Sequence, residues 1–244
     1  MDYLAPATLE DAYRALEAED ARCLAGGQSL VAMMNLGLVS PARLVSLRRI
    51  EALRGIEPQA DGSLRIGAMT THAELAELKH PSAEASLLEQ AARVVAYPAV
   101  RAWGTIGGSV AHADPAADYP VVLVAARAII EVGSAAGTRH IAAEDFFRGF
   151  FETALAKGEI VTAIHLPAVP KGARTNYQKL SLVAGDFAIL SVAAIGNEVT
   201  VGGYGPKPVR MENITTIDPL SDHRASAAYR RRVLPELVRR CTSH

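Results

Sequence analysis

Two short segments of this sequence have the residue types that bind phosphate groups. Residues 25–29 read AGGQS and residues 105–109 read TIGGS, so each pairs two glycines with a hydroxyl side chain. Backbone N–H groups at a glycine-rich turn before a helix commonly hold diphosphates, and glycine lets the backbone approach closely. A single glycine pair is equally typical of a plain turn, but two matched segments favour one diphosphate-binding site. We expect a Cβ at Gly107 to block the approach of the diphosphate.

Other nucleotide-binding patterns are missing from both segments. Neither matches GxGxxG, nor GxxxxGK followed by Ser or Thr, which disfavours a Rossmann site and a P-loop NTPase. His112 and Asp114 follow the second segment, but two residues at i and i+2 do not make a metal site. We expect His112 to form loop hydrogen bonds, Asp114 to fix the turn before Pro115, and Trp103 to anchor packing.

The only two cysteines, Cys23 and Cys241, lie in neither a CxxC nor a CxH arrangement. Zinc and iron–sulfur sites are therefore not expected in this chain. Two scattered cysteines are typical of free thiols in a reducing compartment, although their number allows one disulfide. Any iron–sulfur centre that exchanges electrons with this protein is expected on another chain.

The composition is that of an ordinary globular protein. A chain of 244 residues can hold one large domain or two modest ones, and its net charge of −1 offers no basic field to nucleic acid. The longest apolar run, residues 120–126, is too short to span a bilayer, and residues 1–6 do not resemble a signal peptide. We expect a cytoplasmic protein with no transmembrane segment and no nucleic-acid partner.

Local patterns predict the elements that position the two segments. The first is expected between a strand over 22–25 and a helix over 30–36. Other predicted elements of this half are helices over 8–18, 71–78 and 84–96, a strand over 43–47 and a hairpin within 53–68. Residues 97–120, which contain the second segment, show little periodicity and are predicted to be mostly an ordered, functional loop.

Strands dominate the prediction for the second half. After a helix over 121–125 and a strand over 128–132, strands are expected over 160–166, 176–182, 188–195 and 198–204, and a basic helix over 223–240. Pro167, Pro170 and Gly172 cluster where the strand pattern pauses, so we place a domain boundary near Leu166-Pro167.

The motifs resemble the flavin subunit of molybdenum hydroxylases. AGGQSL at 25–30 and TIGGSVAHADPAADYP at 105–120 are similar to that family, typified by the medium subunit of aerobic carbon monoxide dehydrogenase and the flavin domain of xanthine dehydrogenase. The resemblance covers roughly the first 210 residues. It implies an α+β fold, with a PCMH-type two-subdomain FAD-binding domain over 1–167 and a shortened α+β C-terminal domain over 168–244.

The resemblance also implies which residues bind FAD. They are Leu24, Ala25, Gly26, Gly27, Gln28, Ser29, Leu30, Gly104, Thr105, Gly107, Gly108, Ser109, Asp118, Val161, Lys179, Asp186 and Phe187. Three of these have ordinary alternatives: Asp118 as the cap of a helix over 119–126, Val161 as strand core, and Lys179 as a solvated strand lysine.

The implied function is electron transfer within a larger flavoenzyme. A molybdopterin-binding large subunit would oxidise the substrate, [2Fe–2S] clusters on a small subunit would relay electrons to FAD, and NAD⁺ or a quinone would accept them. The family implies a dimer of heterotrimers, with no catalytic residue for the organic substrate on this chain. Carbon monoxide, purines, aldehydes and N-heterocycles all remain open as substrates.

The sequence departs from the family pattern in two places. Ser109 stands where asparagine is usual, and the region after Val209 is short.

Two other functions stay open. A stand-alone flavin-dependent oxidase or reductase of the same superfamily would need a substrate pocket in the C-terminal part. An assembly protein with a degenerate FAD site would not take up FAD at all.

Overall fold

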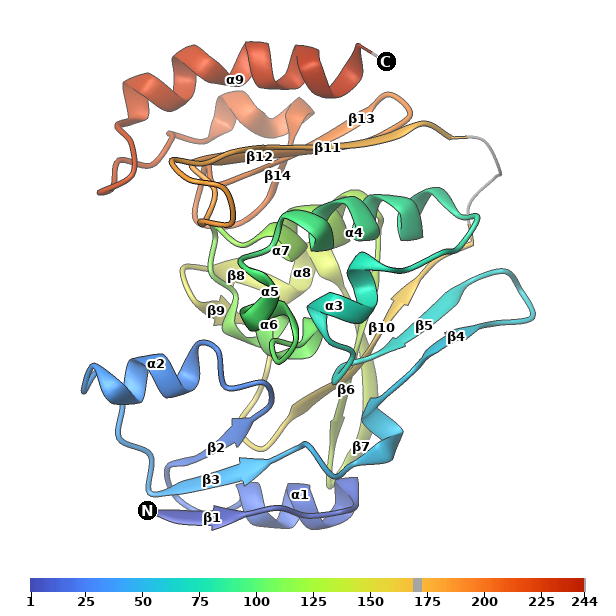
Figure 1. The fold of residues 1–244 in the computed structure, drawn as a ribbon, viewed down its shortest axis with the longest axis vertical. Helices are drawn as coiled ribbons and strands as arrows, with labels where there is room; N and C mark the ends of the chain where they lie inside the picture. Colours follow the sequence, from blue (N-terminus) through green and yellow to red (C-terminus); the bar gives the residue numbers. More distant parts are fainter. Residues whose placement is uncertain (169–172, 244) are drawn as a thin grey trace.

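The structure, a computed structural model, describes residues 1–168 and 173–243. Its N-terminal part is a parallel three-stranded sheet in the order β1-β3-β2, drawn in blue in Figure 1. The strands are β1 (Asp2–Leu4), β2 (Ala21–Leu24) and β3 (Arg43–Ser46), joined by α1 (Leu9–Leu16) and α2 (Leu30–Asn35). Thr8 caps α1 because its side chain accepts a hydrogen bond from the Asp11 N–H.

The central sheet has five strands in the order β4-β5-β10-β6-β7, and every neighbouring pair is antiparallel. The strands are β4 (Ile56–Pro58), β5 (Leu64–Gly67), β6 (Ile129–Ser134), β7 (Gly137–Ala142) and β10 (Ile160–Leu166). A short 3-10 turn, η1 (Glu51–Leu53), precedes β4. Because β10 returns between β5 and β6, the sheet joins segments that lie far apart in the sequence.

Helices between β5 and β6 cover one face of the central sheet. They are α3 (His72–Ala76), α4 (Ala83–Val94), α5 (Pro98–Arg101), α6 (Ile106–His112) and α7 (Asp118–Ala125). Between β7 and β10 lie α8 (Ala143–Phe146), β8 (Phe147–Gly149) and β9 (Glu152–Thr153). Thr71 and Glu74 form a capping box that starts α3. None of the helices within the described ranges is long and apolar enough to cross a membrane.

A four-stranded antiparallel sheet in the order β11-β12-β13-β14 follows. Its strands are β11 (Thr175–Leu180), β12 (Leu190–Ile195), β13 (Glu198–Gly202) and β14 (Val209–Arg210), with η2 (Met211–Thr216) and α9 (Ala227–Thr242) after them. Figure 1 shows α9 on the outer face of this sheet and α4 and α7 on its inner face. The two helices α4 and α7 therefore lie between the two larger sheets.

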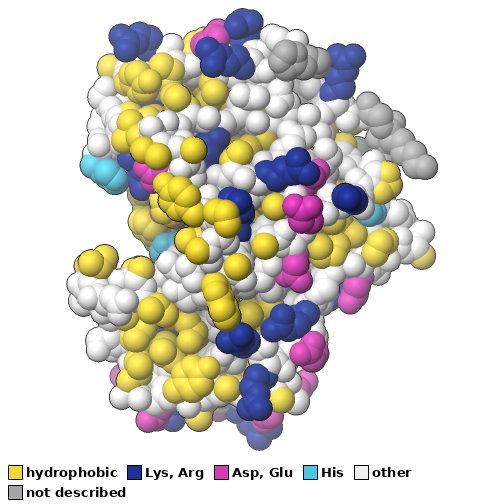
Figure 2. Space-filling view, in the orientation of Figure 1, with side chains coloured by type: hydrophobic (Ala, Val, Ile, Leu, Met, Phe, Trp, Pro, Cys, Tyr) yellow, Lys and Arg dark blue, Asp and Glu magenta, His cyan; other side chains and the backbone are white. Residues whose placement is uncertain are grey.

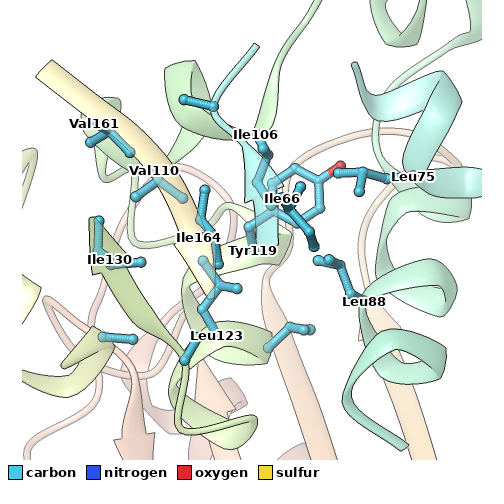
Figure 3. Close-up of a cluster of buried hydrophobic side chains, with 14 of the residues drawn as sticks. Ile66, Leu75, Leu88, Ile106, Val110, Tyr119, Leu123, Ile130, Val161 and Ile164 are labelled. Carbon is cyan, nitrogen blue, oxygen red and sulfur yellow. The ribbon is translucent and has the colours of Figure 1, made fainter. Parts of the chain in front are cut away.

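The main hydrophobic core lies between the central sheet and its helices (Figure 3). Side chains from β5, β6 and β10 meet those of α3, α4, α6 and α7; those labelled are Ile66, Leu75, Leu88, Ile106, Val110, Tyr119, Leu123, Ile130, Val161 and Ile164. A second buried cluster lies between the four-stranded sheet and α9. Each layer thus has an apolar face to bury, which stabilises the stack.

The α+β class predicted from the sequence is confirmed, and most strands lie within two residues of their predicted bounds. The prediction for residues 97–120 was wrong, because this segment holds α5, α6 and the start of α7. All eight residues of α7 are buried, so the helix has no polar face and its sequence shows no helical period. Strand β7 was missed because its residues face solvent along a sheet edge. Pro170 and Gly172, which were used to predict the domain boundary, lie outside the described residues.

Candidate functional site

A cavity of about 710 Å³ lies where the three sheets and the α5–α7 segment meet. This volume is within the range of pockets that hold drug-sized ligands, roughly 300–1,000 Å³. Figure 2 shows the surface indented on the left, between the lobe that carries α2 and the body above it, with hydrophobic side chains around the indentation. The wall combines residues from both glycine segments with residues from β10, β11 and the loop after β11.

The first glycine segment forms the turn between β2 and α2, as predicted. Gly27 has φ +75°, a conformation that favours glycine. Gln28 folds back so that its side-chain amide donates to the Gly26 carbonyl at 3.1 Å. Within the described part of the chain, the backbone N–H groups of residues 26–29 have no hydrogen-bond partner. A set of unpaired donors lining a cavity is a suitable site for an anion.

The second glycine segment is the first turn of α6. Thr105 caps this helix because its Oγ1 accepts from the Gly108 N–H at 3.2 Å. The Ile106 N–H donates to the Thr70 carbonyl at 3.0 Å, and the Gly107 N–H donates to the Ala68 carbonyl at 2.9 Å. The N–H groups of residues 106–108 are therefore already used, in contrast to those of the first segment.

From the sequence, a Cβ at Gly107 is expected to block a diphosphate. The structure gives a different reason for glycine at this position. A Cβ at this position would lie 2.5 Å from the Ala68 Cβ and 2.7 Å from the Ala68 carbonyl oxygen. Glycine is required here because α6 packs directly on the end of β5. Gly108 is the residue whose added Cβ would face the first segment, 3.6 Å from the Ala25 Cβ.

The two glycine segments also touch each other through their backbones. A Cβ at Gly26 would overlap the Trp103 carbonyl oxygen and lie 2.8 Å from the Gly104 Cα. A Cβ at Gly104 would lie 2.6 Å from Nε2 of His72. These contacts hold the segment 25–29 against the residues that lead into α6.

Asp118 lies in a buried network that joins three elements. Its Oδ2 lies 3.0 Å from Nζ of Lys179, and its Oδ1 accepts from the Tyr177 hydroxyl at 2.6 Å. Lys179 also donates to the Val94 carbonyl at 3.2 Å. Burial raises the pKa of Asp118, while the Lys179 charge and the hydrogen bonds oppose that shift.

Two of the alternative roles are contradicted by this network. Asp118 is the first residue of α7, Ala117 occupies the cap position, and no side chain caps the helix. The Lys179 side chain is only 7% exposed, so it is not a solvated strand lysine. Val161 is buried in β10 and contributes to the core, and it also lines the cavity. Both readings of Val161 therefore apply.

His72 and Tyr119 form a second buried pair at the cavity. The Tyr119 hydroxyl lies 2.9 Å from Nδ1 of His72, and the His72 N–H donates to the Gly104 carbonyl at 2.9 Å. Burial, with a contribution from the Arg101 charge, lowers the pKa of His72 to about 4. The ring is therefore neutral at physiological pH and acts as a hydrogen-bonding group.

Most of the predicted site residues are brought together in this cavity. Those that line it are Ala25, Gly26, Gly27, Gln28, Ser29, Leu30, Thr105, Gly107, Gly108, Ser109, Asp118, Val161, Lys179, Asp186 and Phe187. Leu24 and Gly104 do not line it. The sequence interpretation missed other lining residues, among them Arg22, Met33, His72, Tyr97 and Leu155. The only local signal for His72 was its place at the start of the predicted helix over 71–78.

Three neighbouring residues were assigned minor roles from the sequence. Asp114 fixes its turn as predicted, because its Oδ1 accepts from the Ala116 N–H at 2.8 Å. His112 is the last residue of α6 rather than a loop residue, and its ring lies 5.1 Å from that of Phe151. Trp103 is 52% exposed, so it is not a packing anchor; the Arg48 guanidinium lies over its ring at 4.7 Å.

Comparisons with known proteins place this geometry in context. Residues 1–169 match the family model described as "FAD binding domain in molybdopterin dehydrogenase". The glyceraldehyde dehydrogenase medium chain of Sulfolobus acidocaldarius is 36% identical over 97% of this chain and 95% of its own length. A solved structure of reconstituted CO dehydrogenase from Oligotropha carboxidovorans superposes with a TM-score of 0.92 at 31% identity, covering 99% of this chain and 96% of that one. For quinoline 2-oxidoreductase from Pseudomonas putida 86, the TM-score is 0.90 at 28% identity, with 99% and 95% covered.

The close contact at Gly26 predicts a large effect of one added methyl group. Gly26→Ala is expected to lower the free energy of unfolding by about 1–3 kcal/mol, because neither the Ala25–Ser29 turn nor the Trp103 carbonyl can move without disturbing the other. Urea unfolding measures this. Gly149→Ala is the control, since its Cβ would meet only the Glu152 side chain, at 3.3 Å; equal losses in both variants would contradict the prediction.

Buried His72 is expected to make the fold sensitive to acid. Its pKa is lowered from 6.5 to about 4, so only the unfolded chain binds this proton between those pH values. The stability contributed by the neutral ring is therefore present at neutral pH and falls as pH falls from 6.5 toward 4, by roughly 3 kcal/mol in full.

Urea unfolding at neutral pH and at pH about 5 measures this dependence. His72→Gln should flatten the loss of stability with falling pH. Exposed His223 serves as the control, and His223→Gln should keep the wild-type dependence. The same dependence in all three proteins would exclude His72 as its source.

Proposed function

The chain belongs to the family of FAD-binding domains of molybdopterin dehydrogenases, and we propose that it is the electron-transfer subunit of a molybdenum hydroxylase complex. It is a flavoprotein oxidoreductase subunit whose cofactor is FAD. The observation that carries the proposal is that one cavity collects both glycine segments and the Asp118–Lys179 pair.

The donor groups of the cavity suit the proposed cofactor. We propose that the unpaired N–H groups of residues 26–29 hold the FAD diphosphate, because they are free donors on residues that line the cavity. Thr105 and Ser109 of the second segment also line the cavity and carry hydroxyl groups. Leu24 and Gly104, which do not line the cavity, would support this site from behind.

Other predicted residues divide between polar and apolar roles. Asp118 would accept hydrogen bonds from the cofactor, with Lys179 holding its charge in place. Val161 would pack against a ring of the cofactor. Asp186 and Phe187 come from the loop after β11, and we propose that they face the isoalloxazine region; Phe187 is 42% exposed and lies 5.5 Å from the Arg224 guanidinium.

We propose two domains with a boundary in the segment after β10. Residues 1–167 would form the PCMH-type FAD-binding domain, and residues 168–244 the shortened C-terminal domain. A second buried cluster between the β11–β14 sheet and α9 supports this division, while Tyr177 and Ala193 from the same sheet belong to the main core. The alignment with the Sulfolobus medium chain spans 268 positions, whereas this chain has 244 residues, which agrees with a shortened chain.

The proposed role requires partner subunits. A bound flavin supplies one-electron and two-electron exchange. We propose that a large molybdopterin subunit oxidises the substrate, that [2Fe–2S] clusters of a small subunit deliver electrons, and that NAD⁺ or a quinone removes them. The assembly would be a dimer of heterotrimers. Cys23 and Cys241 are free thiols, which supports a cytoplasmic location and leaves the clusters to a partner.

A charge placed at Ser29 tests the diphosphate site. Ser29→Asp is expected to weaken FAD binding at least ten-fold, about 1.4 kcal/mol, because a carboxylate beside the free N–H groups would repel the phosphates and compete for their donors. Ser29→Asn has nearly the same shape without the charge, and both residues are favoured at a helix start, so both variants should fold. FAD content and titration of the stripped protein measure the difference; equal FAD affinity in the two variants would contradict the assignment.

The chain purified alone is expected to bind FAD but to oxidise none of the candidate substrates, because we assign the substrate chemistry to the large partner subunit. The measurement is the absorbance spectrum and turnover of the chain with and without its partners. Co-purified subunits should add iron–sulfur absorption and substrate-dependent bleaching of the flavin. Steady turnover by the isolated chain would favour a stand-alone flavoenzyme, and a colourless chain that takes up no FAD would favour an assembly protein.

A further inference from the structure

Three potential metal ligands lie together on the central sheet, on the face opposite the main core. Glu131 is on β6, His140 on β7 and His165 on β10. Glu131 pairs directly with His140 across β6 and β7. On its other side Glu131 pairs with Ala163, two residues before His165, so all three side chains share one face.

The ligand atoms converge on one carboxylate oxygen. Oε2 of Glu131 lies 2.9 Å from Nε2 of His165 and 3.7 Å from Nε2 of His140. All three donor atoms lie within 4.8 Å of one another. Ligands at about 2.0–2.2 Å around a tetrahedral ion are about 3.3 Å apart, so the two measured separations bracket the required value.

The other carboxylate oxygen of Glu131 is held by neighbours. Oε1 accepts from the Thr162 hydroxyl at 2.7 Å and from the Arg65 guanidinium at 3.4 Å. These two contacts fix the orientation of the Glu131 carboxylate, with Oε2 directed at the two imidazoles. Such outer contacts are how proteins orient metal ligands.

We propose that Glu131, His140 and His165 bind a divalent transition-metal ion, with Zn²⁺ as the best-suited metal. Two imidazole nitrogens and one carboxylate oxygen match the ligand preference of zinc and do not suit calcium or magnesium, which prefer oxygen. The half-exposed His140 side chain leaves room for water as the fourth ligand. Binding through Nε2 would require that nitrogen to be unprotonated in both imidazoles, so a proton held there would move to Nδ1 or be released to solvent.

This site is separate from the cavity, because none of its three ligands lines that cavity. The ion would connect the edge strand β7 to β6 and β10. We therefore assign it a structural role, which is to hold the exposed edge of the central sheet in register.

The test uses the full chain without a polyhistidine tag, in the complex in which it purifies, after chelator treatment. Zn²⁺ uptake is measured by equilibrium dialysis and metal analysis, and thermal unfolding is followed with and without Zn²⁺. The wild type should take up one additional Zn²⁺ and melt at a higher temperature. His140→Gln and His165→Gln should each weaken Zn²⁺ binding by more than about ten-fold. Loss of an outer contact to a ligand already weakens metal binding by about ten-fold or more, and loss of a ligand should cost at least as much.

His223→Gln is the matched control, because His223 is exposed and lies outside the three-residue cluster. It should retain wild-type binding, and FAD content reports whether each variant is folded. The proposal is overturned if the wild type takes up no Zn²⁺ beyond that of the variant lacking both His140 and His165. In that case the three side chains form only an ion-paired hydrogen-bond cluster.

Discussion

The structure depends on backbone segments that approach too closely for any side chain between them. Gly26 lies against the Trp103 carbonyl, Gly107 against Ala68, and Gly67 against the Leu53 carbonyl. Each contact joins elements from different parts of the chain, and together they place the end of β5, the start of α6 and the turn after β2 around one cavity. A methyl group at any of these positions would push two backbone segments apart, because no space is left between them. The glycines are therefore required first by packing, and the shape of the site follows from it.

The C-terminal sheet completes this cavity through a buried ion pair. Lys179 on β11 meets Asp118 on α7, and Tyr177 donates to the same carboxylate. Removing one partner of a buried pair leaves an uncompensated charge, which is far more costly than the pair is favourable. The sheet must therefore dock correctly for Lys179 and Tyr177 to reach the Asp118 carboxyl and oppose the effect of its burial.

Sequence patterns were sufficient where each element has a solvent face or a clear cap. The turn at 25–29 could be predicted because a strand and an amphipathic helix flank it. Residues 97–120 could not, because α7 is buried on every side and α6 begins with two poor helix formers, Gly107 and Gly108. The Asp118–Lys179 contact spans 61 residues, and no local pattern predicts such a pair. Resemblance to a family suggested both residues, but only the fold gives the reason that they meet.

The two glycine segments share a sequence pattern but differ in what they offer a ligand. The N–H groups of residues 26–29 are free, whereas those of residues 106–108 are bound to Thr70, Ala68 and Thr105. A phosphate can accept hydrogen bonds only from donors that are not already satisfied, or at the expense of existing bonds. This asymmetry supports a division in which the first segment contacts the diphosphate and the second forms a rigid wall that contributes mainly hydroxyls.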